Sequence, residues 1–245
     1  MGLITYESLR SFAYVNDRIV THPIRGIALK FFGLNGRDMY AEETASGQYY
    51  AARGILYVVP YNNPWAWMNR QAVAYTDEIL DVLIQKYALP ESIPIASTGG
   101  SMGGMSALVY SRYAKRTPAV CVANCPVCDM PYHYTERPDL PRTLYSAFFH
   151  EVHAGKAIED ILKTVSPLHL AEEMPDIPYY LFHCTADKAV NKELHSDRFV
   201  DAMKKAKRTV TYHVIPDRGH CDIGDDMKAL FLEYAVREIE KANNE

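Results

Sequence analysis

Six short apolar runs of strand length recur along the chain and limit the folds that it can adopt. They lie at residues 27–32, 55–59, 93–97, 119–123, 179–184 and 210–215. Most are separated by longer segments, and several of these repeat apolar residues every three or four positions, as amphipathic helices do. The clearest helical segments lie at residues 72–87, 105–113 and 227–239. Strands that alternate with helices need crossover connections, so the pattern predicts an α/β fold with a mostly parallel, doubly wound sheet flanked by helices.

The chain has 245 residues, of which 48% are hydrophobic, so it can bury one sizeable core. We therefore expect residues 1–245 to form a single domain. Residues 11–20 carry a weak pattern for an early strand. Residues 129–167, rich in proline and aromatic residues, lie between two predicted strands and exceed a simple crossover in length. We expect this segment to fold over the sheet edge as a short cap.

Charge and hydropathy exclude several classes of protein. The formal net charge of −4 argues against a nucleic-acid partner. No window holds 18 uninterrupted apolar residues, and residues 1–6 lack the charged and apolar regions of a signal peptide, so neither a membrane span nor export is expected. An odd number of cysteines, five, favours reduced thiols. These features together predict a cytoplasmic protein.

Cys121, Cys125 and Cys128 form a C-x3-C-x2-C string that is similar to an iron–sulfur ligand pattern. Cys121, however, lies inside the apolar run at 119–123, where a free cysteine behaves as a small hydrophobic residue. We therefore expect no metal site and no cofactor.

Residues 99–103, Gly-Gly-Ser-Met-Gly, match the G-x-S-x-G pattern of a nucleophile on a sharp strand-to-helix turn. The required context is present, because an apolar run precedes the glycines and a helical pattern follows them. Ser101 is the predicted nucleophile. The alternatives are a structural turn or a phosphate-binding glycine loop, but the G-x-G start of a dinucleotide fingerprint is missing.

A serine hydroxyl needs a base and a group that orients the base. Asp187 follows the run at 179–184, and His220 follows the run at 210–215, so both would lie at carboxyl ends of strands. We expect His220 to act as general base and Asp187 to orient it. Asp217 and Asp222 remain alternatives for the orienting carboxylate.

These motifs resemble the α/β-hydrolase superfamily, within it the prolyl oligopeptidase-like and dienelactone hydrolase-like branches. The resemblance rests on residues 99–104, 166–190 and 218–222 and covers nearly all of the chain beyond residue 90. It implies a serine hydrolase with Ser101, Asp187 and His220 as its triad. His183 fills a position where this family often has a histidine, and it is expected to pack rather than to react.

The resemblance also implies an oxyanion hole built from two backbone amides. One is the amide of Met102. The other is the amide of Leu34, in a loop similar to the family's His-Gly-x loop, although Phe32 replaces the usual histidine. Tyr61 competes as a donor through a Tyr-x-x-Pro string, but it lies too close to Ser101 in the sequence for that match.

Tyr61, Trp65 and Trp67 follow a strand on the predicted catalytic edge, and we expect them to line the substrate pocket. Ordinary packing against the neighbouring helix is the alternative for the two tryptophans.

The predicted reaction is hydrolysis of carboxylic esters of small, sugar-linked or aromatic acyl groups through an acyl-enzyme. Residues 1–92 precede the nucleophile strand and leave no room for the propeller of prolyl oligopeptidases, so a small peptidase is the second choice. A non-catalytic ligand-binding protein on this fold is the third. The expected partner is a small-molecule ester or short peptide. Whether copies of the chain form a homo-oligomer is left open.

Overall fold

Seven strands form one sheet in the computed structural model, which describes residues 3–244. The spatial order is β1-β3-β2-β4-β5-β6-β7, and only β1 is antiparallel to its neighbour. The strands are β1 Ala13–Val15, β2 Gly26–Phe31, β3 Ile55–Pro60, β4 Ile95–Gly100, β5 Val120–Asn124, β6 Tyr179–Cys184 and β7 Val210–Ile215. The predicted α/β fold with a mostly parallel sheet is confirmed. Of the segment examined for a signal peptide, Met1 and Gly2 lie outside the described residues.

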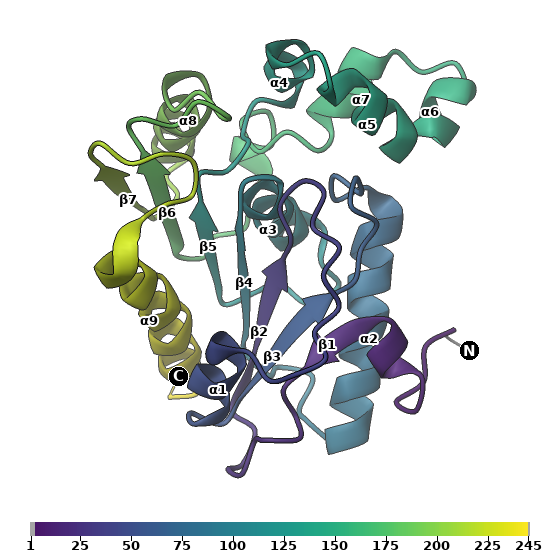
Figure 1. Ribbon diagram of the computed structural model, residues 1–245, viewed down its shortest axis with the longest axis vertical. Coiled ribbons are helices and arrows are strands. Elements are labelled where there is room, and N and C mark those ends of the chain that lie inside the picture. The colour runs from purple at the N-terminus through teal and green to yellow at the C-terminus, as the bar shows by residue number, and fades with distance from the viewer. Residues whose placement is uncertain (1–2, 245) are drawn as a thin grey trace.

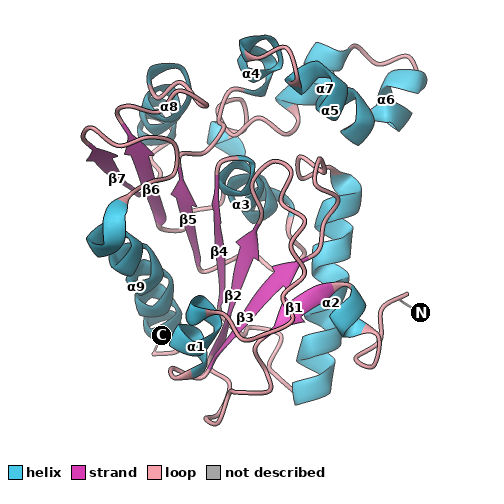
Figure 2. Cartoon of the chain, in the orientation of Figure 1, coloured by secondary structure: helices cyan, strands magenta, loops and turns pink. Residues whose placement is uncertain are grey.

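Helices cover both faces of the sheet (Figures 1 and 2). Helices on one face are α2 Arg70–Tyr87, α3 Met102–Tyr113 and α8 Arg198–Lys205. Helices on the other face are α1 Ala45–Ala51 and α9 Gly224–Ala242. The structure also has short 3₁₀ turns at η1 Leu9–Ser11 and η2 Ala171–Glu173 and a π-type turn at η3 Glu193–Asp197. This is the doubly wound arrangement that the sequence predicts.

Each face of the sheet has its own core because successive strand residues point to opposite sides. In β2, Ile27 and Leu29 pack against the α2 and α3 side, whereas Ala28 packs against the α1 and α9 side. Helix α2 follows the predicted pattern: Asn69 caps its first turn by accepting from the amide of Ala72. The central strands from β2 to β6 are thus buried on both faces, as their near-continuous apolar sequences require.

A cap of four short helices lies between β5 and β6 and stands over the carboxyl edge of the sheet (Figure 1). The helices are α4 Met130–Glu136, α5 Leu140–Ala147, α6 Phe149–His153 and α7 Ile158–Lys163. This insertion was predicted over residues 129–167. Among residues 3–244, we find no helix whose length and hydropathy would suit it to crossing a membrane.

Candidate active site

Ser101 forms the turn between β4, which ends at Gly100, and α3, which begins at Met102. Its backbone has φ 59° and ψ −128°, which is strained for any residue with a side chain. The Ser101 amide donates a 2.9 Å hydrogen bond to the carbonyl of Asn124 at the end of β5. The turn therefore holds the Ser101 side chain at the carboxyl edge of the sheet.

The glycines on either side of Ser101 are required by close backbone contacts. A Cβ atom at Gly99 would lie 2.1 Å from the Gly103 carbonyl oxygen. A Cβ atom at Gly103 would lie 2.2 Å from the carbonyl oxygen of Phe31 in β2. Helix α3 can approach the sheet this closely only without those side chains, so the G-x-S-x-G pattern has a steric cause.

Asp187 and His220 follow β6 and β7 and meet beyond the ends of these strands. The distance from His220 Nδ1 to Asp187 Oδ2 is 2.7 Å. The other carboxylate oxygen accepts hydrogen bonds from the amides of Ala189 and Val190, at 2.8 and 3.0 Å. The Asp187 side chain is fully buried. Asp187 is therefore held in place by its own loop, with one oxygen turned to the imidazole.

A second histidine also contacts Asp187. His183 Nε2 lies 3.3 Å from Asp187 Oδ2, and its Nδ1 lies 2.7 Å from the hydroxyl of Ser196. Burial alone would raise the pKa of Asp187, but hydrogen bonds from His183, His220 and the Val190 amide outweigh burial and hold that pKa well below its ordinary value. His183 is buried, and it also supports the carboxylate, a contact that the sequence did not reveal.

The pKa of His220 is shifted upward. Burial disfavours the charged ring, but hydrogen bonds with Asp187 and Cys125 outweigh this effect and raise the pKa of His220 to about 9. Its Nε2 lies 3.7 Å from the Cys221 sulfur. Within residues 3–244, no hydrogen bond joins His220 to the hydroxyl of Ser101.

The two alternative carboxylates have other contacts. The amide of Asp217 donates to the hydroxyl of Thr185 in a tight turn, and the carboxylate of Asp222 lies 3.0 Å from the Arg218 guanidinium. Neither carboxylate reaches His220 among the described residues. Of the three candidate carboxylates, Asp187 is therefore the one that contacts the His220 imidazole.

The loop after β2 lies against the nucleophile turn. A Cβ atom at Gly33 would be 3.7 Å from the Ser101 Cβ atom. The amides of Leu34 and Met102 make no hydrogen bond within the part of the chain that the structure describes. Met102 also begins helix α3, whose N-terminal dipole favours negative charge. Two free donors therefore flank the turn.

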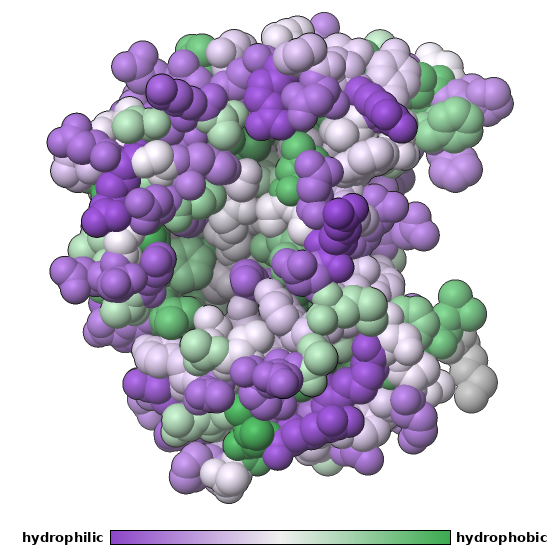
Figure 3. Space-filling model, in the orientation of Figure 1, coloured by the Kyte–Doolittle hydropathy of each residue, from purple (hydrophilic) through white to green (hydrophobic). Residues whose placement is uncertain are grey.

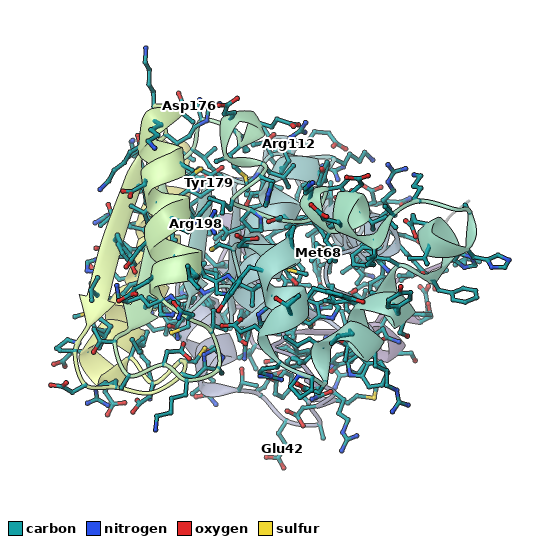
Figure 4. The ribbon with its side chains drawn as sticks, turned by 90° about the horizontal axis from the view of Figure 1, so that it is seen from above. Glu42, Met68, Arg112, Asp176, Tyr179 and Arg198 are labelled. Carbon is teal, nitrogen blue, oxygen red and sulfur yellow. The ribbon has the colours of Figure 1, made fainter. Side chains whose placement is uncertain are left out.

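A cavity of about 780 Å³ lies between the loop after β3, the start of α2 and the cap helices α5 and α6. Tyr61 and Trp65, two of the predicted pocket residues, line it. Trp67 does not. Its ring is 1% exposed, and its indole N–H donates to the hydroxyl of Thr143 in α5 at 3.1 Å. Figure 4 looks down on the cap and places the adjacent Met68 near the middle of the molecule. Trp67 therefore packs under the cap, because its polar N–H finds a buried partner there.

One group of side chains in the cap has the composition of a metal site. Glu136 Oε2 lies 2.5 Å from His133 Nδ1 and 3.0 Å from His195 Nε2. His195 Nδ1, however, accepts hydrogen bonds from the amides of Cys128 and Asp129. A neutral ring that accepts at Nδ1 carries its proton on Nε2, so His195 donates to Glu136 and offers no lone pair to a metal ion. The group is a hydrogen-bonded link between α4 and η3.

The three cysteines of the C-x3-C-x2-C string do not face one centre. Cys121 and Cys128 pack in the core on the α3 side of the sheet, and Cys125 packs on the α9 side. Cys125 instead lies beside Cys221 and His220, with both sulfurs and a ring nitrogen within 4.8 Å of one another. Only the adjacency of Cys221 to His220 in the sequence hints at this cluster.

Solved structures of other proteins share this fold. The puromycin-hydrolyzing peptidase of Mycobacterium tuberculosis is 15% identical with a TM-score of 0.72, and the match covers 90% of this chain and 34% of that one. The Pyrococcus horikoshii acylaminoacyl peptidase is 16% identical with a TM-score of 0.68, over 91% of this chain and 38% of that one. The Thermogutta terrifontis esterase 2, in a structure phosphonylated by sarin, is 19% identical with a TM-score of 0.60, over 87% and 82%. The chain thus spans about a third of the length of the two peptidases.

No curated protein sequence matches the chain. The profile of the Prolyl oligopeptidase family, Peptidase S9, matches residues 68–237. This range contains the Ser101 turn, Asp187 and His220. The chain has the α/β-hydrolase fold, and it belongs to the prolyl oligopeptidase family.

Proposed function

We propose that this protein is a serine hydrolase that cleaves carboxylic esters through an acyl-enzyme on Ser101. One observation carries the proposal: Ser101 occupies a strained turn at the sheet edge where His220 and Asp187 form a 2.7 Å pair. Family membership supports the general reaction class.

In the proposed mechanism, the Ser101 hydroxyl oxygen attacks the ester carbonyl carbon while His220 Nε2 takes the hydroxyl proton. Asp187 keeps the proton on Nδ1 and stabilises the imidazolium. The amides of Met102 and Leu34 donate hydrogen bonds to the carbonyl oxygen as it becomes negative. His220 then gives its proton to the leaving alkoxide, which departs as an alcohol.

Deacylation uses the same groups. A water molecule gives a proton to His220 and its oxygen attacks the acyl carbon, after which the proton returns to the Ser101 oxygen and the acid is released. We expect one end of the ester to lie in the cavity that Tyr61 and Trp65 line, since aromatic walls suit an apolar group.

An ester is the preferred substrate because the Thermogutta terrifontis esterase is matched over 82% of its own length. The two peptidases are matched over only 34% and 38% of theirs. A small peptidase is the second candidate, favoured by the family match and by the higher TM-scores of the peptidases.

Paired initial rates test the proposal. We expect turnover of p-nitrophenyl butyrate far above that of an aminoacyl p-nitroanilide, with loss of both activities and of fluorophosphonate labelling in Ser101→Ala. Ser92→Ala, at an exposed loop serine before β4, is the matched control and should behave as wild type. Comparable anilide turnover would favour the peptidase. Ester turnover that persists in Ser101→Ala would overturn the role of Ser101.

A further inference from the structure

A second cavity, of about 380 Å³, lies between α1, α9 and the sheet, on the face opposite α2 and α3. Figure 3 shows this face hollowed near its middle, with pale and green residues between hydrophilic ones. The cavity has the size of a small-molecule site. Ser101, Asp187 and His220 are not among the residues that line it.

A lysine lies on the floor of this cavity. Lys30 belongs to β2, between β3 and β4, and points to the same face as Ala28. Its ammonium lies 5.8 Å from the Phe32 ring centre, and no carboxylate of residues 3–244 forms an ion pair with it. Burial lowers the pKa of Lys30, and the charge of Asp38 opposes the shift only in part. A largely buried ammonium without an ion-pair partner is costly, because it has lost water and the charge of Asp38 compensates for that loss only in part.

Two buried oxygens at the same cavity also lack a partner. The hydroxyl of Tyr50 and the side-chain oxygen of Asn124 make no hydrogen bond among the described residues. The Asn124 side-chain amide donates to the Cys221 carbonyl at 3.1 Å, which fixes the orientation of this group. Buried polar groups are nearly always paired in folded proteins. Both oxygens are almost inaccessible to solvent, so they lie behind the cavity wall, and Lys30 remains the buried polar group that a ligand in the cavity would meet.

The remaining walls are apolar and aromatic. Tyr57 stands on β3, where its ring stacks on that of Tyr50 at a centroid distance of 5.2 Å. Phe231 and Leu232 of α9 face it from the helix side. The only other cation in the lining, Lys228, is exposed and lies 3.2 Å from Asp225. The cavity thus combines one unpaired positive charge with an apolar body.

We propose that this cavity binds a small organic acid. The carboxylate of the ligand pairs with the Lys30 ammonium, and its aromatic or aliphatic body lies between Tyr57 and α9. Such a site goes beyond the proposed hydrolysis, and its binding needs no turnover.

The site touches both turns of the proposed catalytic centre. Gly100 and Cys221 line the cavity, and they precede Ser101 and follow His220 in the sequence. A bound acid would therefore contact the backbone of the two turns that carry Ser101 and His220.

Fluorine NMR titration with 4-fluorobenzoate tests the site in the Ser101→Ala protein, where no turnover occurs. We expect Lys30→Met to raise the Kd about ten-fold or more, as loss of a charged hydrogen bond does. Lys228→Met, the matched control at the exposed rim, should change the Kd by no more than about three-fold because exposed charges contribute little. The uncharged 4-fluorobenzyl alcohol should bind more weakly than the acid.

Melting temperatures separate binding from folding. Lys30→Met should melt no lower than the parent protein, since it removes an unpaired buried charge. If Lys30→Met fails to fold, Leu232→Trp is the second test, because its larger side chain fills the cavity from α9. The acid should no longer bind to this variant. Three results would each overturn the proposal. They are an unchanged Kd in Lys30→Met, no binding of 4-fluorobenzoate to the parent protein, and binding that is lost only in Trp65→Ala, which changes the other cavity.

Discussion

The turns at the carboxyl edge of the sheet and the cap above them are held in different ways. At the edge, the hydrogen bonds join backbone to backbone. The Ser101 amide donates to the Asn124 carbonyl, and the Thr185 amide donates to the Ile215 carbonyl at 2.8 Å. The cap is attached through side chains, such as Trp67 on Thr143 and the Asn69 amide on the Ala147 carbonyl at 2.8 Å. Figure 2 shows the cap as short helices joined by loops, with no strand of its own.

The two regions therefore differ in how well they tolerate substitution. A backbone contact leaves no room for a new atom, so the edge responds sharply to substitution. A side-chain contact can be lost singly while neighbouring contacts remain. The proposed chemistry therefore rests on the less tolerant region, and the cap can vary around the substrate.

The largest expected effect is at the carboxylate of the edge. Asp187→Asn should lower kcat on p-nitrophenyl butyrate by about 10³–10⁴-fold, because an amide no longer holds the imidazole proton on Nδ1. Asp217→Asn and Asp222→Asn are matched controls at the neighbouring loop, and both should keep wild-type rates since neither contacts His220. An equal loss in Asp222→Asn would contradict the assignment.

The second effect compares a glycine of the edge with a glycine of the cap. Gly103→Ala should lower the free energy of unfolding by about 3 kcal/mol, because its Cβ would overlap the Phe31 carbonyl. Gly155→Ala, which has open space around it and φ 86°, should lower it by about 1 kcal/mol through backbone strain alone. Urea denaturation measures both. Equal losses would show that the two regions are alike in rigidity.

The third effect is a difference between the histidines of the two regions in how they influence the pH dependence of kcat/KM. Because hydrogen bonds to Asp187 outweigh burial and raise the pKa of His220 to about 9, its base form is scarce at neutral pH. We expect kcat/KM to rise about ten-fold per pH unit between pH 6 and 8 and to level off near the raised pKa. Burial instead lowers the pKa of His133 in the cap, so His133→Gln should leave this profile in place. A plateau reached below pH 7 would contradict the prediction.

The smallest expected effect on the proposed chemistry comes from a change in the cap. Glu136→Gln should lower the stability of the cap by about 1.5–3 kcal/mol, since it weakens charged hydrogen bonds with His133, His195 and the Asn191 amide. Faster hydrogen exchange over residues 130–163, with unchanged fluorophosphonate labelling of Ser101, is the expected result. Slower labelling would mean that the cap also supports the edge.

The same link has a defined pH dependence. Burial would raise the pKa of Glu136, but hydrogen bonds from His133 and His195 outweigh burial and lower the pKa well below its ordinary value of 4.5. The unfolded chain therefore takes up a proton at higher pH than the folded one. The stabilisation is present above pH 4.5 and is lost as the pH falls below it.

Much of the edge could be predicted from the sequence because its signals are local. The G-x-S-x-G string is a run of consecutive residues, although Gly103 is required by a contact with Phe31 of β2. Asp187 and His220 follow soon after apolar runs that are strands. Strand limits were less accurate: the run at 93–97 predicts β4 two residues early, and the strand in fact continues through Gly100. It continues because backbone pairing with β5 does not depend on which side chains the strand carries.

The fold class, the cap insertion and the strand ends that carry Ser101, Asp187 and His220 follow from the sequence alone, because hydrophobic period and the G-x-S-x-G string are patterns of neighbouring residues. The contact of His183 with Asp187 and the packing of Trp67 under the cap are visible only in the folded chain. The same holds for Lys30, which lines a cavity and forms no ion pair among the described residues. These outcomes depend on which distant segments pack together, and no spacing along the chain records that packing.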